Sequence, residues 1–525
     1  MMSTLTACGE TLNPRFESPI VKFCKINSRY WSKQIEKYMG CVFVEGSLAC
    51  SGPNYAFRTA LIGKAIEKKL CLEPIVIFDH GEVNSEVRKI YESFEIKRFL
   101  VLENKIKEYG YKAMAIILAI FYMIFFGRKI INNPFGVAFG DIILGDLVYD
   151  DLLRVNKLYT VNKMKFKDIS VLYAAFKLYF VYSYFFKKHK PSYTIVTHIQ
   201  YVAYGILARL AGKYDSTLII STDIDLYFCD NQFLGQPVIY HEVARHNMNN
   251  VLATMSDLRK DQLVEKSKSY LQARFRGKLE QIDIMLAYRN KRSYSESELR
   301  NELELNSNPI AVIMCHVFSD SPKSSISIFN NYFDWLSETL DFVRSQKSVN
   351  WIVKPHPSAA DVYGEHGVVE NMVTLMNEPH VKLVPGDLGT QSLADWTNYL
   401  ITMSGTAGLE FAACGIKVVV AGRPFYSDNG FTFDAHSVPE YFATLNNLDK
   451  LPDLNPRQIR EAQCWLGLFD HFSVKSEIIT EEVLKHVWGY QVPKDLDKSF
   501  EILTANLKKK NPQDEFLYKQ ILQSL

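Results

Sequence analysis

No two of the nine cysteines have the two-residue spacing of a metal-binding or redox pair, and their number is odd. Several lie inside apolar runs, where cysteine behaves as a small hydrophobic residue. These observations exclude a disulfide framework and a zinc site of the common spacing. They favour a protein of the reducing cytoplasm, and we predict that location.

An excess of one charge is also lacking, because 60 Lys and Arg residues stand against 58 Asp and Glu residues, for a net charge of +2. Such a chain has no overall positive field that would attract nucleic acid. We therefore expect no nucleic-acid partner. The 525 residues are more than one hydrophobic core supports, which predicts at least two domains.

The first residues lack the basic start and apolar centre of a secretory signal. The longest uncharged apolar run, residues 113–126, is shorter than the roughly 20 residues of a membrane-spanning helix. A second, aromatic-rich stretch covers residues 171–186. Basic residues follow both stretches, namely Arg128, Lys129, Lys187, Lys188 and Lys190. The stretches are either buried core helices or a surface that rests on a membrane, with its basic residues at anionic headgroups.

In both halves of the chain, short β-branched runs alternate with helical patterns. Expected strands in the first half cover residues 41–45, 74–78, 98–102, 193–198 and 217–221. Expected strands in the second half cover residues 311–315, 351–354, 398–403 and 417–421. Continuous apolar strands separated by helices indicate parallel sheets that are covered on both faces. We predict an α/β protein with two Rossmann-type domains facing each other across a cleft.

The domain boundaries follow from a change of character between residues 247 and 308, where charged, helix-favouring sequence lacks strand signals. We predict an N-terminal Rossmann-like domain over residues 1–246 and a helical connecting region over residues 247–308. A C-terminal Rossmann-like domain is predicted over residues 309–455 and a final helical segment over residues 456–525.

Two prolines enclose a histidine directly after one expected strand, in the sequence KPHP at residues 354–357. The prolines restrict the backbone and hold the ring in one direction. Ligands of open parallel sheets bind beyond the carboxyl ends of the strands. His356 is therefore placed to donate a hydrogen bond to a phosphate or a leaving oxygen, and Lys354 adds positive charge. The alternative is a rigid turn with an incidental histidine.

Small residues follow another expected strand and open a helix, in the sequence SGTAGLE at residues 404–410. Backbone N–H groups at the start of a helix can approach an anion, and the helix dipole favours it there. Ser404, Gly405 and Thr406 are predicted to bind phosphate, and Glu410 is placed to reach ribose hydroxyls. The alternative is a capped helix without a ligand, since Ser is a common N-cap.

A third loop, residues 422–432, combines Gly, Pro and aromatic residues. This composition predicts a shaped loop over the donor side of the cleft, with Tyr426 as a binding residue. The sequence HVFSDSP at residues 316–322 adds His316 and Ser319 to the same expected crevice. No DxD pair follows a strand in this half, so we expect neither a metal nor another cofactor, and phosphate charge neutralised by protein donors.

The combination of KPHP (354–357), SGTAGLEFAACGIKVVVAGRPFY (404–426) and GFT (430–432) resembles the capsule polysaccharide and surface-carbohydrate biosynthesis family, which includes Kdo transferases. The resemblance is strong over residues 310–434. It is weaker over residues 145–150 with Arg154, and over residues 198–201 with Gly205 and Arg209. It implies the GT-B glycosyltransferase fold, with the acceptor in the first domain and the nucleotide-sugar donor in the second. By this resemblance, His356 and the loop of Ser404 and Thr406 hold the donor nucleotide and its phosphate.

The same resemblance implies a glycosyltransferase that moves a sugar, Kdo or another acid sugar from CMP, onto a capsule, O-antigen or other surface glycan. UDP-sugar-dependent transferases, glycerophosphotransferases and UDP-sugar 2-epimerases share the fold and stay alternatives. A non-catalytic scaffold of a capsule-assembly complex is an alternative of another class. The expected partners are a nucleotide-sugar donor, a glycan or glycolipid acceptor and, as a peripheral contact, the cytoplasmic face of the inner membrane.

A base for the acceptor hydroxyl is expected from the first domain, across the cleft from the donor. Related CMP-sugar enzymes place two carboxylates and a glycine after an early strand, and here Glu45-Gly46 follows Val44. Glu45 is the predicted base, and its rivals are Asp146, Asp223, Asp225 and His198. The predicted catalytic residues are Glu45, His356 and Asp146. The predicted acceptor-side residues are Asp150, His198, Tyr201 and Asp223.

Overall fold

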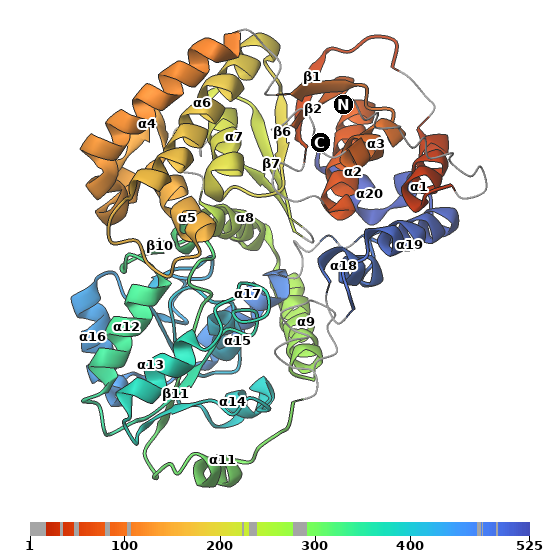
Figure 1. The fold of residues 1–525 in the computed structure, drawn as a ribbon. Helices are drawn as coiled ribbons and strands as arrows, with labels where there is room; N and C mark the ends of the chain where they lie inside the picture. Colours follow the sequence, from red (N-terminus) through yellow and green to blue (C-terminus); the bar gives the residue numbers. More distant parts are fainter. Residues whose placement is uncertain are drawn as a thin grey trace, which may run out of the picture.

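The computed structural model describes residues 17–31, 35–46, 52–78, 85–101, 107–222, 225–229, 239–276, 291–469, 474, 476–489 and 492–525. Two α/β domains face each other, the N-terminal domain in the upper half of Figure 1 and the C-terminal domain in the lower half. Each domain is built around a six-stranded sheet. The predicted fold class, two Rossmann-type domains in a GT-B-like arrangement, is confirmed.

The N-terminal sheet has the strand order β3-β2-β1-β6-β7-β8, and β8 runs antiparallel to β7. Its strands are β1 (Gly40–Glu45), β2 (Leu72–Phe78), β3 (Arg98–Val101), β6 (Tyr193–Val196), β7 (Thr217–Ser221) and β8 (Leu226–Cys229). The strand order reverses between β1 and β6. This reversal is a topological switch point, beyond which doubly wound sheets bind their ligands.

Helices cover both faces of this sheet because its central strands are apolar on both sides. Alternate side chains of β1 enter different cores, Phe43 one and Val44 the other. The core around Phe43 includes α4 (Lys107–Asn132), α5 (Gly145–Asn156), α6 (Ile169–His189) and α7 (Tyr201–Lys213). The core around Val44 includes α1 (Pro19–Asn27), α2 (Pro53–Leu70) and α3 (Ser85–Ser93).

The C-terminal sheet repeats the plan, with the all-parallel order β12-β11-β9-β13-β14-β16. Its strands are β9 (Ile310–Met314), β11 (Asn350–Lys354), β12 (Val381–Leu383), β13 (Tyr399–Thr402), β14 (Lys417–Val420) and β16 (Phe433–Asp434). Its helices are α12 (Tyr332–Val343), α13 (Val368–Met376), α14 (Thr390–Trp396), α15 (Ala407–Ala413) and α16 (Val438–Asn446). The switch point lies between β9 and β13.

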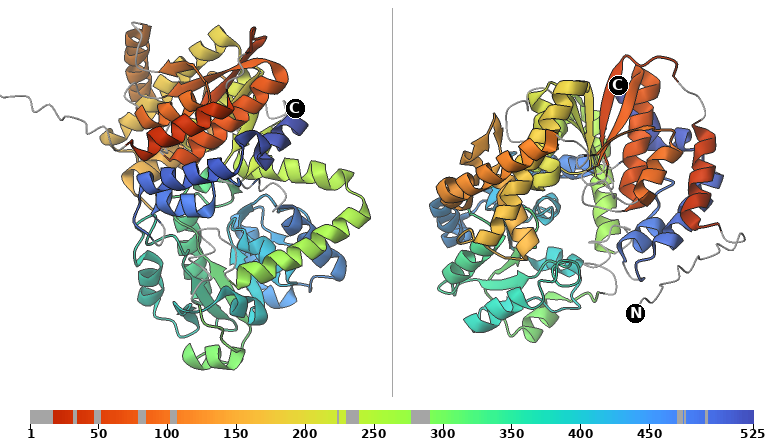
Figure 2. Two further views of the ribbon diagram at one scale, coloured as in Figure 1. Left: turned by 90° about the vertical axis from the view of Figure 1, so that its right-hand side faces the viewer. Right: turned by 45° about the horizontal axis from the view of Figure 1, so that its top comes forward.

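Helices α8 (Tyr240–Thr254), α9 (Asp257–Phe275) and α11 (Glu296–Glu302) lead from the first domain to the second, and α17 (Pro456–Phe469) packs on α9. The chain then returns to the first domain. Helices α18 (Glu481–Trp488), α19 (Leu496–Lys509) and α20 (Phe516–Ser524) lie beside α1 and α2, as Figures 1 and 2 both show. The buried Arg58 of α2 fixes this return by donating to the carbonyl oxygen of Val474 at 2.7 Å.

The two apolar stretches of the sequence form helices that differ in their surroundings. Residues 113–126 are the middle of α4, which has 26 residues and is longer than the run alone suggests. Residues 171–186 lie in α6, which has 21 residues. By length and composition alone, both helices qualify as membrane spans, a test that core helices also pass. The apolar window of α4 is 33% buried, whereas that of α6 is 61% buried.

Candidate active site

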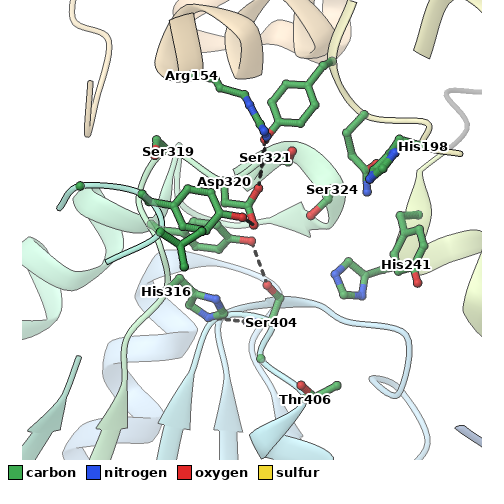
Figure 3. Close-up of a pocket in the computed structure, with 18 of the residues that line it drawn as sticks. Arg154, His198, His241, His316, Ser319, Asp320, Ser321, Ser324, Ser404 and Thr406 are labelled. Carbon is green, nitrogen blue, oxygen red and sulfur yellow. Dashed lines mark hydrogen bonds and ion pairs between the residues drawn. The ribbon is translucent and has the colours of Figure 1, made fainter. Parts of the chain in front are cut away.

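A cleft of about 1030 Å³ lies between the two domains, beyond the carboxyl ends of both sheets at their switch points. Figure 3 shows the side chains of both walls around this space. The N-terminal wall includes Arg154, His198, Tyr201 and His241. The C-terminal wall includes His316, Asp320, Ser404 and Thr406.

His316 stands at the switch point of the C-terminal sheet, just after β9. Its ring stacks on Tyr332 of α12, with the ring centroids 4.2 Å apart. Its Nε2 atom accepts the backbone N–H of Ser404 at 3.3 Å and lies 3.2 Å from Oγ1 of Thr402. Burial and, to a smaller extent, the neighbouring His356 and His241 lower the pKa of His316 to about 3. The ring is therefore neutral at pH 7, with its proton on Nδ1 because Nε2 accepts.

The side chain of Tyr426 supports the loop between β13 and α15. The hydroxyl of Tyr426 donates to the carbonyl oxygen of Gly405 at 2.6 Å. A Cβ atom at Gly408 would lie 2.1 Å from the same hydroxyl, so only glycine fits there. The side chains of Ser404 and Thr406 border the cleft. The small residues of this motif therefore allow the loop to pack closely against Tyr426.

Two backbone N–H groups of the predicted anion-binding loop already donate to acceptors within the protein. The N–H of Ser404 donates to His316, and the N–H of Gly405 donates to Oγ1 of Thr402 at 3.2 Å. Helix α15 has only seven residues. The loop therefore offers an anion mainly the side-chain hydroxyls of Ser404 and Thr406, supported by a fixed backbone.

The carboxylate of Asp320 joins the two walls. It accepts hydrogen bonds from the hydroxyls of Tyr201 and Tyr363, each at 3.0 Å. Nη1 of Arg154 lies 3.9 Å from it, and the Arg154 guanidinium stacks 4.6 Å above the centre of the Tyr201 ring. Burial and the nearby negative charge of Asp320 raise the pKa of Tyr201. Tyr201 is therefore a permanent donor that orients the carboxylate.

Two neutral histidines complete the N-terminal wall. His198 follows β6, and His241 lies in the first turn of α8. Burial lowers the pKa of each to about 4, helped by the positive charges of Arg154 and Arg245 respectively. Nδ1 of His241 accepts the backbone N–H of Phe425 at 3.2 Å, which leaves the proton on Nε2. At pH 7 both rings therefore border the cleft as uncharged hydrogen-bonding groups.

Five of the predicted donor-side residues come together in the cleft, namely His316, Ser319, Ser404, Gly405 and Thr406. The hydroxyl of Ser319 donates to the buried carboxylate of Glu365 at 2.8 Å, so it also fixes the loop after β9. Lys354, His356, Glu410 and Tyr426 are not among the lining residues. Nδ1 of His356 accepts the N–H of Ser358 at 3.2 Å, and burial lowers the pKa of Lys354 to about 8.

Glu410 has a different partner from the predicted ribose. Its carboxylate is buried and forms an ion pair with Arg274 of α9, with Nε and Oε1 2.8 Å apart. This pair ties α15 to the inter-domain helix. The aromatic residues of the loop at 422–432 are likewise internal, since Phe425, Tyr426 and Phe431 are all buried. Their composition reflects packing, and Phe425 alone among them borders the cleft.

Among the predicted acceptor-side residues that the structure describes, His198 and Tyr201 line the cleft, but Asp150 does not. Glu45 ends β1 with no exposed surface, and its Oε2 accepts the N–H of Thr197 at 3.0 Å as well as the Thr197 hydroxyl. These two hydrogen bonds join the carboxyl ends of β1 and β6. This geometry does not support Glu45 as the base, because a substrate cannot reach its carboxylate.

The remaining predicted carboxylates also have structural surroundings. Asp146 of α5 forms a two-pronged pair with Arg209 of α7, and both side chains are almost fully buried. Asp150 accepts the backbone N–H of Lys323 at 3.2 Å, and burial raises the pKa of Asp150. Asp223 lies outside the described residues. The rival Asp225 accepts the hydroxyl of Tyr240 at 3.0 Å.

Several cleft residues were missing from the predicted set, namely Arg154, His241, Asp320, Tyr363 and His366. Asp320 carried a usable signal, because it lies one residue after the predicted Ser319 in the loop that follows β9. His241 carried no such signal, since it does not directly follow a predicted strand. Within the described ranges, no three His, Cys, Asp or Glu side chains are grouped closely enough to hold a metal ion.

Residues 222–451 match the family model of the capsule polysaccharide biosynthesis protein. No curated protein matches the sequence. Similar solved structures include KpsC of Thermosulfurimonas dismutans, a beta Kdo 2,4 transferase, with 14% identity over 52% of this chain and 87% of that chain at a TM-score of 0.34. They also include S. aureus MnaA with UDP, with 13% identity over 87% of this chain and 100% of that chain at a TM-score of 0.29.

The UDP-GlcNAc 2-epimerase of Methanocaldococcus jannaschii has 10% identity over 82% of this chain and 99% of that chain, at a TM-score of 0.27. Such low scores carry no argument about activity. The family match covers both sides of the C-terminal switch point, where His316, Ser404 and Thr406 lie. It agrees with the resemblance of the sequence motifs. Over residues 222–451, this chain is similar to the capsule polysaccharide biosynthesis family.

Proposed function

We propose that the protein is a glycosyltransferase that moves a sugar from a nucleotide-activated donor to a hydroxyl of a surface glycan or glycolipid in the cytoplasm. The observation that carries this proposal is the cleft itself. It places the fixed hydroxyl loop of the C-terminal switch point opposite Arg154 and Tyr201 of the N-terminal domain, and Asp320 of the C-terminal wall contacts both of these residues. Such an arrangement suits a reaction between two substrates that bind to opposite walls.

The C-terminal wall is proposed to hold the donor phosphate. The hydroxyls of Ser404 and Thr406 face the cleft from a loop whose backbone does not need to rearrange. Fixed donors aimed at developing negative charge stabilise a leaving phosphate without reorganisation. The neutral ring of His316 positions the loop through the N–H of Ser404. We propose that these donors act without a catalytic metal.

Asp320 is proposed to accept the proton of the acceptor hydroxyl. Only two carboxylates, Asp320 and Asp361, border the cleft among the described residues. Asp320 is the one whose direction is fixed by two tyrosine hydroxyls and by Arg154. A base must lie within reach of the reacting hydroxyl and keep its orientation.

For the donor we propose a CMP-linked acid sugar such as Kdo. The cleft presents the cations Arg154 and Lys157, which suit the carboxylate of an acid sugar. The hexose of a UDP-sugar has no carboxylate of its own to pair with them, and only the diphosphate could. UDP-sugars are therefore the rival donors of the same reaction class.

Calorimetry of the purified protein with CMP, CDP and UDP tests the proposal first, and turnover with EDTA tests it second. We expect binding of CMP in preference to UDP, and activity that survives EDTA. Binding of none of the three nucleotides would instead favour a non-catalytic scaffold. Turnover of UDP-sugars alone would overturn the CMP donor, and complete loss with EDTA would overturn the metal-free mechanism.

A further inference from the structure

One face of α4 exposes a continuous apolar surface on the N-terminal domain. Ile117, Ile124 and Phe125 are 66%, 68% and 68% exposed. The other large exposed apolar residues of this helix are Met114, Ile116, Ile120 and Phe121. Their spacing of three and four residues places them on one side of the helix. Single exposed apolar residues are common, but a contiguous patch marks an interaction surface.

The opposite face of α4 holds the helix in the fold. Ala115, Ala119 and Ile130 are buried in the core that α4 shares with α6. The hydroxyl of Tyr122 donates to the carbonyl oxygen of Ala138 at 2.8 Å. Figure 1 shows α4 along the outer rim of the domain. The helix therefore presents its apolar face outward while its other face stays packed, an arrangement that suits a helix lying on a surface and not one that crosses a bilayer.

The charges around this face are positive. Residues 110–140 contain no Asp or Glu, and Arg128 and Lys129 are exposed near the end of α4. The segment KMKFK, residues 163–167, reaches the same end, because a Cβ atom at Gly127 would lie 3.3 Å from Sδ of Met164. In this segment Phe166 is 81% exposed. The three lysines of the segment are also exposed.

We propose that this face of α4, together with residues 163–167, docks the protein on an anionic lipid bilayer. The isoleucines and phenylalanines enter the boundary between headgroups and acyl chains, and the basic residues contact the headgroups. A second copy of the chain fits less well, because a two-fold dimer on this face would bring like charges together. The proposal is independent of the transfer reaction.

The inference assigns different roles to the two apolar helices. Because α6 packs between α4 and α7 and is largely internal, it makes no part of the docking face. Apolar composition alone gave both stretches the same two interpretations. The packing of α6 identifies it as a core helix. The exposed apolar face of α4 and the basic residues at its end favour the membrane-binding interpretation for α4.

Flotation of the purified full-length protein with vesicles tests the proposal. The vesicles contain phosphatidylcholine alone or phosphatidylcholine with about a third phosphatidylglycerol. We expect binding to the anionic vesicles that weakens at high salt, as each basic residue near an anionic surface contributes roughly fivefold. The double variant Ile117→Glu with Phe125→Glu should lose at least tenfold in binding. The triple variant Arg128→Gln, Lys129→Gln and Lys165→Gln should lose a similar amount.

The matched control is the double variant Leu258→Glu with Leu375→Glu, because these two residues are also highly exposed but lie on α9 and α13. It should bind like the unchanged protein, and circular dichroism should show all variants folded. Equal binding by the Ile117→Glu and Phe125→Glu variant would overturn the proposal, and so would equal binding to neutral vesicles or no binding to either vesicle. A doubled mass in light scattering that this variant abolishes would assign the face to a second copy.

Discussion

The two walls of the cleft are built by different means although both stand at the switch point of a Rossmann-type sheet. Around the donor loop, the C-terminal wall is a neutral surface of hydroxyls and a buried imidazole, with its backbone fixed by hydrogen bonds such as that from Tyr426 to Gly405, and its carboxylates Asp320 and Asp361 lie in other loops. The N-terminal wall carries charge and aromatic rings, with Arg154 stacked on Tyr201 and both directed at Asp320.

The difference indicates a division of labour. A wall of fixed neutral donors suits a group common to many donors, such as a phosphate. A wall of charged and aromatic groups suits discrimination between sugars and acceptors, because unpaired polar groups penalise the wrong ligand. Changes in the network of Arg154, Tyr201 and Asp320 should therefore affect mainly turnover, whereas changes in the loop of Ser404 and Thr406 should affect mainly nucleotide affinity.

The largest effect is expected for Asp320→Asn. Removing the proposed base should lower kcat by about a thousandfold, within the usual range for general-base catalysis. The affinity for the nucleotide should change less than threefold, because the donor loop is untouched. Steady-state kinetics and calorimetry measure the two quantities. The matched control is Asp361→Asn, the other carboxylate of the cleft, which should keep near-normal turnover. The reverse pattern would assign the base to Asp361.

The next effect concerns the support of the N-terminal wall. Asp146 and Arg209 pair α5 with α7, the helices that carry Arg154 and Tyr201. Arg209→Met leaves a buried carboxylate without its partner and should lower the free energy of unfolding by about 3 kcal/mol. Denaturant unfolding measures it. Adding Asp146→Leu should restore much of the loss, and a double variant as unstable as the single one would contradict this account.

A smaller effect is expected from the neutral histidines. The pKa of His241 lies near 4 in the folded protein, below its ordinary 6.5. Between these values the unfolded chain binds a proton that the folded ring does not, so the free energy of unfolding falls as the pH falls. The loss is at most about 2 kcal/mol from pH 6.5 to pH 5 for one histidine. His241→Gln should remove this part of the pH dependence of the free energy of unfolding, whereas His436→Gln, at an exposed histidine, should not. Denaturant unfolding at several pH values measures it.

The C-terminal wall is tested by Thr406→Val, which removes a cleft hydroxyl without changing the side-chain shape. The affinity for the nucleotide should fall about fivefold, equivalent to about 1 kcal/mol for one hydrogen bond. Calorimetry measures it, and kcat should fall as well, by no more than about tenfold, because the same hydroxyl stabilises the leaving phosphate. Thr444→Val on α16 is the matched control and should have no effect. A large fall in kcat with unchanged affinity would mean that the two walls do not divide the work as proposed.

The fold was predictable from the sequence because its signals are local. Each main strand is a short β-branched run, and the order of strands and helices follows from reading these runs along the chain. The strands β8, β12 and β16 are absent from the prediction, and β12 and β16, with three and two residues, are the shortest strands of the two six-stranded sheets. The loop of Ser404 and Thr406 was also predictable, since small residues between a strand and a helix are a local pattern.

The rest of the site depends on contacts between distant parts of the chain. The sequence could place Asp320 beside the predicted Ser319, but its partners Arg154, Tyr201 and Tyr363 belong to three other segments. Likewise, composition does not show that Glu410 meets Arg274 or that α4 is exposed where α6 is buried. Sequence reasoning finds residues that follow strands, but it does not show whether their side chains turn into the cleft or into the core.

Glu45 gives the smallest expected effect and the sharpest test of this distinction. In Glu45→Gln the amide oxygen, placed where Oε2 lies, can still accept both the N–H and the hydroxyl of Thr197. We expect turnover within about threefold of the unchanged protein, because the buried side chain joins β1 to β6 and does not reach a substrate. Glu45→Ala, which deletes both bonds, should instead lower the free energy of unfolding by about 2 kcal/mol. A hundredfold fall in kcat for Glu45→Gln, with nucleotide affinity intact, would return the role of base to the N-terminal switch point and take it from Asp320.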